Sequence, residues 1–177
     1  NLVNGVVNPG LINGVACAGG CTAQPNTPSA DTDRIAVIDL GSTQDGTQFN
    51  FGERQLAVIR GTVYSDRNAN NTREAGTDGG IAGVTLTLHQ GADCTAPQVG
   101  TTTTAADGSY ALTNTTAGLT YTVCEVQPAG YGDGATNPGT NGTSGAPNRI
   151  TITNLPAAGS SNNDFGERAA AIAGTVY

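Results

Sequence analysis

Apolar and polar residues alternate along several short stretches of this chain, with the period of two that a half-buried β-strand requires. In the clearest stretch, Val84, Leu86 and Leu88 alternate with two threonines and His89. Asp107-Gly108 separates two further stretches and is typical of the tip of a tight hairpin. The pattern therefore predicts an all-β chain.

Seven strands are predicted in the central part of the chain, each short and bounded by Gly, Asn or Pro. They cover 56–65, 84–89, 99–104, 109–113, 120–126, 149–155 and 163–170. The intervening segment 131–147 is rich in Gly, Asn, Thr and Pro, and we expect it to be a surface loop. Seven short strands at this spacing predict a β-sandwich with Greek-key connections.

Two four-residue motifs each occur twice. Phe51-Gly52-Glu53-Arg54 returns 114 residues later as Phe165-Gly166-Glu167-Arg168, and Gly61-Thr62-Val63-Tyr64 returns 113 residues later as Gly174-Thr175-Val176-Tyr177. This period is the size of a domain, whereas the units of a solenoid are much shorter. The repeat predicts tandem modules.

The phase of the repeat predicts one complete module and parts of two others. We expect 1–54 to be the C-terminal half of a preceding module, 55–168 a complete module, and 169–177 the first strand of a following one. A half-module cannot bury its own apolar face and leaves strand edges open to addition. Residues 1–54 are therefore expected not to form a closed sandwich by themselves, and head-to-tail association would build an open filament. A longer covalent array and a separate, strand-donating subunit both agree with this phase, and the array is favoured.

Composition excludes several classes of function. The 177 residues include seven Arg, no Lys and 14 acidic residues, for a net charge of -7. An acidic surface repels phosphate backbones and anionic lipids, so no nucleic-acid partner is expected. No apolar run approaches the ~20 residues of a membrane helix. The single histidine, His89, is expected to be a solvated side chain without a partner for a catalytic triad, and we predict no enzyme activity.

Several short motifs follow one another in an order that resembles a known family. They are Asp66-x-Asn68-x-Asn70, Gly80-Ile81-Ala82-Gly83-Val84, Asp107-Gly108-Ser109-Tyr110, Tyr121-Thr122-Val123-Cys124-Glu125, Pro128-Ala129-Gly130-Tyr131 and Phe165-Gly166-Glu167. The order resembles the B-type repeat domains of serine-aspartate-repeat surface proteins, which are relatives of the collagen-adhesin B domain with a prealbumin-like, immunoglobulin-like sandwich. The resemblance covers 55–168 and, in part, 1–54.

The resemblance implies a structural repeat of an extracellular bacterial surface fibre, filament or stalk. Its expected partners are other copies of the same protein or neighbouring repeats. The alternative is an adhesive module that binds a host protein or glycan through its loops, where Tyr131 is the candidate aromatic residue. The absence of Trp argues against this alternative, because binding hot spots favour Trp and Tyr.

The acidic segment after the first strand of the central module is the candidate metal site, and calcium the expected ion. Oxygens spaced two residues apart can converge on one hard cation, as in an EF-hand loop. The candidate ligands are Asp66, Asn68, Asn70, the Thr72 carbonyl, Glu74 and Asp78. The segment departs from the EF-hand pattern at Asn71, where Gly is usual, and at Thr77, where a bidentate Glu is usual. The alternative is a metal-free loop of Asx-turns.

Four cysteines in a chain of short strands favour an oxidising, extracytoplasmic compartment. Cys94 follows the second strand of the central module, and Cys124 is expected on a solvent face beside Thr122. We predict the pairs Cys94 with Cys124 and Cys17 with Cys21, out of three possible connectivities. A zinc site that includes His89 is the less favoured alternative, because the paired Cys-x2-Cys spacing is missing.

Glu125 shares a strand face with Tyr121 and Val123 and is therefore expected to point inward. A buried carboxylate is costly unless it is paired or protonated, so a structural partner such as an arginine or backbone donors is expected. In relatives with a self-formed Lys–Asn crosslink, a glutamate at this place promotes the reaction. This chain has no lysine, so stiffness is expected to come from disulfides and calcium.

Overall fold

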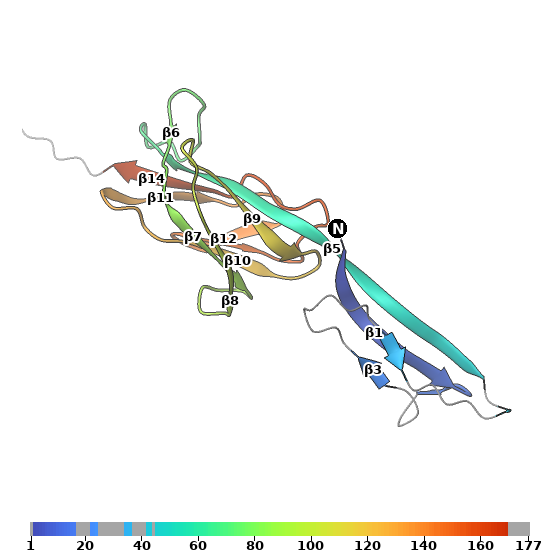
Figure 1. The fold of residues 1–177 in the computed structure, drawn as a ribbon. Coiled ribbons are helices and arrows are strands. Elements are labelled where there is room, and N and C mark those ends of the chain that lie inside the picture. The colour runs from blue at the N-terminus through green and yellow to red at the C-terminus, as the bar shows by residue number, and fades with distance from the viewer. Residues whose placement is uncertain (1, 17–21, 25–33, 37–41, 44, 170–177) are drawn as a thin grey trace, which may run out of the picture. The chain divides into compact units, whose positions relative to one another are not determined.

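The computed structural model describes residues 2–16, 22–24, 34–36, 42–43 and 45–169. The chain divides into two compact units, Asn1–Gln55 and Leu56–Tyr177. Every regular element in the described residues is a β-strand, which confirms the all-β prediction (Figure 1). This part of the chain contains no helix with the length and hydropathy of a membrane span.

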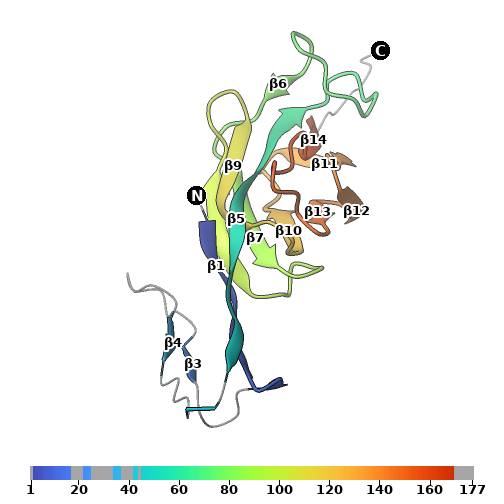
Figure 2. The same cartoon turned by 90° about the vertical axis from the view of Figure 1, so that its right-hand side faces the viewer.

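The second unit is a β-sandwich, as predicted. One of its sheets has the order β9-β5-β14-β11, and Figure 2 shows β9 running beside β5. The strands of this sheet are β9 (Ser109–Thr116), the second half of β5 (Gly46–Ser65), β14 (Asp164–Ala169) and β11 (Tyr131–Asn137). The two-residue β6 (Gly79–Gly80) pairs with the end of β5.

The other sheet is antiparallel throughout, with the order β12-β13-β10-β7-β8. Its strands are β12 (Gly142–Ala146), β13 (Arg149–Ile152), β10 (Tyr121–Glu125), β7 (Thr85–Gln90) and β8 (Gln98–Thr103). The apolar side chains of both sheets form one buried cluster. It includes Ile59, Val63, Leu86, Leu88, Tyr110, Leu112, Val123, Ile150, Ile152 and Phe165.

The second unit contains a strand at each of the seven predicted positions, but two further strands were not predicted and one strand is longer than predicted. The segment 131–147, predicted to be a surface loop, contains β11 and β12, so that prediction was wrong. Within the described part of the chain, both pair along one edge only, with β14 and β13 respectively, and their Gly- and Thr-rich sequences carry no apolar alternation. The strand predicted at 56–65 begins ten residues earlier, at Gly46.

The first unit contains β1 (Leu2–Ile12), β2 (Val15–Ala16) and residues 46–55 of β5. The turn between β1 and β2 is Asn13-Gly14, and both residues have positive φ, 51° and 78°, as a two-residue hairpin turn of this type requires. β3 (Thr22–Gln24) and β4 (Arg34–Ala36) pair antiparallel in a separate two-stranded sheet. That this unit is half of a preceding module remains a prediction, and 170–177, most of the predicted following strand, lie outside the described residues.

Candidate functional site

In the second unit, the two repeated motifs lie on two strands that pair with each other. β5 and β14 run parallel, with Val63 opposite Phe165 and Tyr64 opposite Gly166. Among the described residues, these strands are the first and the last of the unit along the chain. Sequence reasoning identified both strands but not their pairing.

Two glycines allow these strands to pack closely. A Cβ atom on Gly61 would lie 1.8 Å from the carbonyl oxygen of Asn163, and one on Gly166 would lie 2.8 Å from atoms of the Tyr64 ring. Neither position can hold a side chain without displacing its neighbour. Each motif therefore carries a glycine where the opposing segment comes closest.

Hydrogen bonds outside the regular ladder extend this contact along β5. The Arg60 N–H donates to the Ser160 carbonyl at 2.9 Å, and the Arg60 carbonyl accepts from both the backbone and the side-chain amide of Asn163, at 3.2 and 3.0 Å. The Thr62 N–H donates to the Asp164 carboxylate at 2.8 Å. Asn163 is fully buried, so its hydrogen bonds are protected from water.

The acidic loop begins where β5 ends, and its carboxylates bind backbone N–H groups. Asp66, which is buried, accepts from the N–H groups of Asn70 and Asn71, at 3.2 and 3.0 Å. Asp78, also buried, accepts from two other N–H groups of the loop, at 3.1 and 2.9 Å. Asn71 has a φ of 65°, the left-handed conformation that its place in the EF-hand-like spacing requires. These bonds are those of the Asx-turn alternative.

The same residues supply the oxygen donors that calcium prefers, but their present arrangement fits the ion incompletely. The Asn68 side-chain N–H donates to Glu74 at 2.7 Å, so the amide nitrogen of Asn68, rather than its oxygen, faces this carboxylate. The Asn70 side-chain oxygen accepts from the Thr72 N–H at 2.9 Å. Within the described residues, no three acidic, His or Cys side chains are grouped closely enough to hold a metal ion. Calcium binding would therefore require Asn68 and Glu74 to turn.

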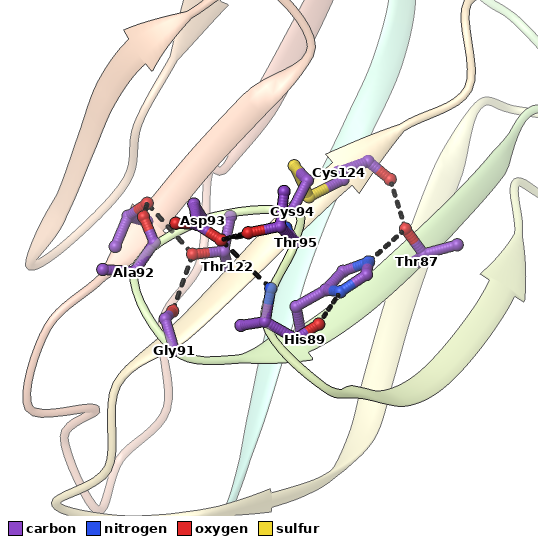
Figure 3. Close-up of a disulfide and its surroundings, with 11 residues drawn as sticks. Thr87, His89, Gly91, Ala92, Asp93, Cys94, Thr95, Thr122 and Cys124 are labelled. Atoms are coloured by element: carbon purple, nitrogen blue, oxygen red, sulfur yellow. Dashed lines mark hydrogen bonds between the residues drawn. A yellow bond between two sulfur atoms is a disulfide. The ribbon is translucent and has the colours of Figure 1, made fainter.

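A disulfide joins Cys94 to Cys124, the pair expected from the sequence, with a Cα–Cα distance of 6.0 Å. It ties the loop 91–97 to the outer face of β10 (Figure 3). Thr122, on the same strand, donates to the Gly91 carbonyl at 2.7 Å. The other predicted pair, Cys17 with Cys21, lies outside the described residues.

The expectation of solvent-exposed side chains on this face was wrong. Cys124 and Thr122 are buried, and His89 is only 8% exposed. The His89 ring nitrogens contact the Ala96 carbonyl at 2.7 Å and the Thr87 hydroxyl at 3.0 Å (Figure 3). Alternation correctly separated the two faces of the strand, but it could not show that a loop folds back over the polar one.

Glu125 points inward as expected and is 7% exposed, but neither of its carboxylate oxygens has a hydrogen-bond partner within the described part of the chain. The arginine or backbone donors expected from the sequence do not contact it. Burial, together with the nearby carboxylates of Glu167 and Asp133, raises the pKa of the Glu125 carboxyl to about 8. The protonated form of Glu125 therefore suits this interior best.

Glu167, on β14, is the second buried carboxyl, at 1% exposure. Burial raises the pKa of Glu167 to about 7, although a hydrogen bond from the Gln127 side chain opposes the rise. The Gln127 carbonyl oxygen accepts from Asn148 at 2.8 Å, and Asn148 also donates to Asp133 at 2.9 Å. The polar network thus reaches Glu167 but leaves Glu125 without a donor.

Comparison with known proteins identifies the family. The model of the SdrD B-like domain family matches residues 57–167. The chain belongs to this family. No curated protein matches the chain.

Solved structures with a similar fold include the shaft pilin SpaA from Lactobacillus rhamnosus GG, at 16% sequence identity and a TM-score of 0.43; the match covers 66% of this chain and 51% of the pilin. A double mutant of that pilin matches at 14% identity and a TM-score of 0.45, over 66% of this chain and 52% of the pilin. The matches thus span about half the length of these pilin structures.

Removal of the Cys94–Cys124 bridge by a double Cys→Ser substitution is expected to destabilise the second unit by about 3–4 kcal/mol, because the bridge restricts a closed loop of about 31 residues in the unfolded chain. Denaturant unfolding monitored by circular dichroism measures the loss.

Non-reducing peptide mass spectrometry of the unmodified chain should find the Cys94–Cys124 bridge together with one between Cys17 and Cys21. Free thiols at all four positions would contradict both pairings.

The buried carboxyls predict that stability falls as pH rises. Glu125 keeps its proton in the folded unit up to about pH 8 but loses it near pH 4.5 when unfolded, so its contribution is complete below about pH 4.5 and is lost between these values. Glu167 acts in the same direction. Between about pH 4.5 and pH 8, the unmodified chain should lose on the order of a few kcal/mol of its free energy of unfolding, at about 1.4 kcal/mol per pH unit. Glu125→Gln should not show this loss, because its side chain does not titrate.

The measurement is the free energy of unfolding against pH for the unmodified chain, Glu125→Gln and a control, Asp45→Asn, whose side chain is exposed. The control should keep the original pH dependence. Equal slopes in all three proteins would show that the Glu125 carboxyl has no part in the effect.

Proposed function

We propose that this chain is a structural repeat of an extracellular bacterial surface fibre, filament or stalk, in which the second unit carries tensile load. Membership of the SdrD B-like family supports the general class. The observation that carries the mechanical part is the parallel pairing of the unit's first and last strands.

Parallel terminal strands place the hydrogen bonds between them in shear when the unit is stretched. Tension enters at the start of the second half of β5 and leaves at the end of β14, and these points lie at opposite ends of the paired segment. The bonds at Arg60, Thr62 and the β5–β14 ladder must then break together rather than one at a time. Bonds that share a load resist more force than bonds that are peeled sequentially.

A single strand connects the two units without an intervening loop. Residues 46–55 of β5 pair with β1 in the first unit, and residues 56–65 pair with β9, β14 and β6 in the second. Tension on one unit therefore passes to the other along one extended backbone, which suits a repeat in a head-to-tail array of copies or neighbouring repeats.

Stiffness in this chain must come from sources other than a Lys–Asn crosslink, because the sequence has no lysine. The Cys94–Cys124 bridge is one source. We propose calcium binding in the acidic loop as another. The loop is attached to the load-bearing contact, since the Asp66 N–H donates to the Glu167 carbonyl at 2.8 Å.

An adhesive role is the second candidate, and one surface feature favours it. A pocket of about 440 Å³ lies between the segments 81–85 and 126–131. Tyr131 lines it together with Val126, which is 55% exposed. Exposed apolar and aromatic residues that line one pocket are a common element of binding sites for proteins and glycans.

Single-molecule stretching tests the mechanical proposal. With handles at the two chain ends, Asn163→Ala should lower the force at which the second unit unfolds, because it removes a buried hydrogen bond to Arg60 across the terminal strands. Asn114→Ala is the matched control, because Asn114 is exposed on β9.

A second pulling geometry tests the role of shear. A handle at Gly118, in the turn after β9, and one at the N-terminus would peel β5 from β9 pair by pair, since Leu56 lies opposite Thr116. The second unit should then open at a much lower force than in the end-to-end geometry. Equal forces in the two geometries would contradict a load-bearing pair of terminal strands.

Calcium is tested by thermal unfolding in calcium and in chelator. If the acidic loop binds the ion in the folded state alone, calcium should raise the melting temperature in a concentration-dependent way. The double substitution Asp66→Asn with Glu74→Gln should abolish the shift. An unchanged melting temperature for the unmodified chain would exclude the site.

A further inference from the structure

The first unit repeats the strand register of the last two strands of the second unit. Glu53 on β5 pairs with Asn4 on β1, just as Glu167 on β14 pairs with Asp133 on β11. In both pairs of strands the register then shifts at the same place. The β1–β5 pair is therefore the structural counterpart of the β11–β14 pair, and Phe51-Gly52-Glu53 occupies the place of Phe165-Gly166-Glu167.

The counterpart differs in what lies on its other edge. In the second unit that edge of β14 pairs with β5, and Glu167 is 1% exposed. Among the residues that the structure describes, no strand pairs with the other edge of 51–53. Gly52 is half-buried and Glu53 is exposed.

We propose that the open edge of 51–53 is a docking edge, and that it takes Gly174-Thr175-Val176-Tyr177 of a second copy of this chain as a parallel strand. This inference rests on the proposed head-to-tail assembly and assigns the contact through which it occurs. Sequence identity points to this occupant. In the second unit, the equivalent edge is covered by Gly61-Thr62-Val63-Tyr64, and 174–177 has the same four residues.

The register of the contact follows from the second unit. Val63 lies opposite Phe165 and Tyr64 opposite Gly166, so Val176 should lie opposite Phe51 and Tyr177 opposite Gly52.

Side chains add specificity to the backbone pairing. Val63 and Tyr64 are completely buried, and the Tyr64 ring covers Gly166 so closely that a Cβ atom there would meet it at 2.8 Å. Gly52, at the equivalent position of its motif, likewise has no side chain that would displace the ring of Tyr177. Strand addition gains affinity from main-chain hydrogen bonds and specificity from such side-chain slots.

Sedimentation velocity over a range of protein concentrations tests the contact. The unmodified chain should self-associate into open chains rather than a closed dimer, because a contact between two different segments, 51–53 of one copy and 174–177 of the next, is heterologous. Tyr177→Ala and Gly52→Val should each weaken the association by about tenfold or more, as expected when a buried aromatic anchor is lost or blocked. Tyr177→Phe should retain it. Thr47→Val, an exposed position on the same strand as Gly52, is the matched control and should also retain it.

Photo-crosslinking locates the contact. A benzophenone side chain at position 177 should attach to 51–53 of a second, isotope-labelled copy. A chain that remains monomeric at every concentration, or crosslinks at other positions, would overturn the proposal. Either result would leave the load-bearing proposal intact, because the stretching experiment probes bonds within the second unit alone.

Discussion

The close parallel packing of β5 against β14 is the constraint on which the second unit depends. Gly61 and Gly166 have no side chains that would hold the strands apart. The buried Asn163 side chain donates hydrogen bonds to the Arg60 carbonyl and the Ser160 hydroxyl. The Tyr110 hydroxyl donates to the Asn163 carbonyl at 2.7 Å and thereby connects β9 to the same point. With these segments fixed, β5 and β14 join β9 on one side to β11 on the other in a single sheet, and the apolar side chains of both sheets form one core.

Polar groups are also organised around this pair of strands. The acidic loop is attached to β14 through Asp66, and Glu167 on β14 faces the interior beside Glu125. An interior carboxyl without a hydrogen-bond donor favours the protonated state, so the unit is expected to be most stable in mildly acidic solution. The disulfide acts on the other sheet, where it holds a loop over β10 and encloses His89. The two sheets are therefore stiffened by different means.

The sequence predicted the features that depend on local pattern. Alternation located most strands of the second unit and the inward direction of Glu125, and the cysteine positions led to the Cys94–Cys124 pair. Two failures share a physical cause, since both depend on contacts between segments, which the alternation within a single strand does not record. The edge strands β11 and β12 are formed by pairing rather than by apolar alternation, and His89 is buried by a loop that folds back over it.

The pairing of the two repeated motifs was also absent from the sequence interpretation, although a signal existed. Both motifs contain a glycine within a strand, and such a glycine often marks a close approach of another backbone. Two glycine-containing strands that recur together could have suggested that they contact each other. In the acidic loop, by contrast, the sequence pattern did not decide between two structures. Its oxygen spacing suits calcium, while its present hydrogen bonds are those of Asx-turns.

Native-state hydrogen exchange tests the central claim most directly, because it measures the free energy of opening at single amides. The Thr62 and Asp66 N–H groups, which donate from β5 and the residue after it to β14, should exchange only through global unfolding of the second unit. Their opening free energies should equal the value from denaturant unfolding and match those of the central strands β7 and β10. Exchange at Thr62 and Asp66 through local opening, at a markedly lower free energy than the β7 and β10 amides, would contradict the account.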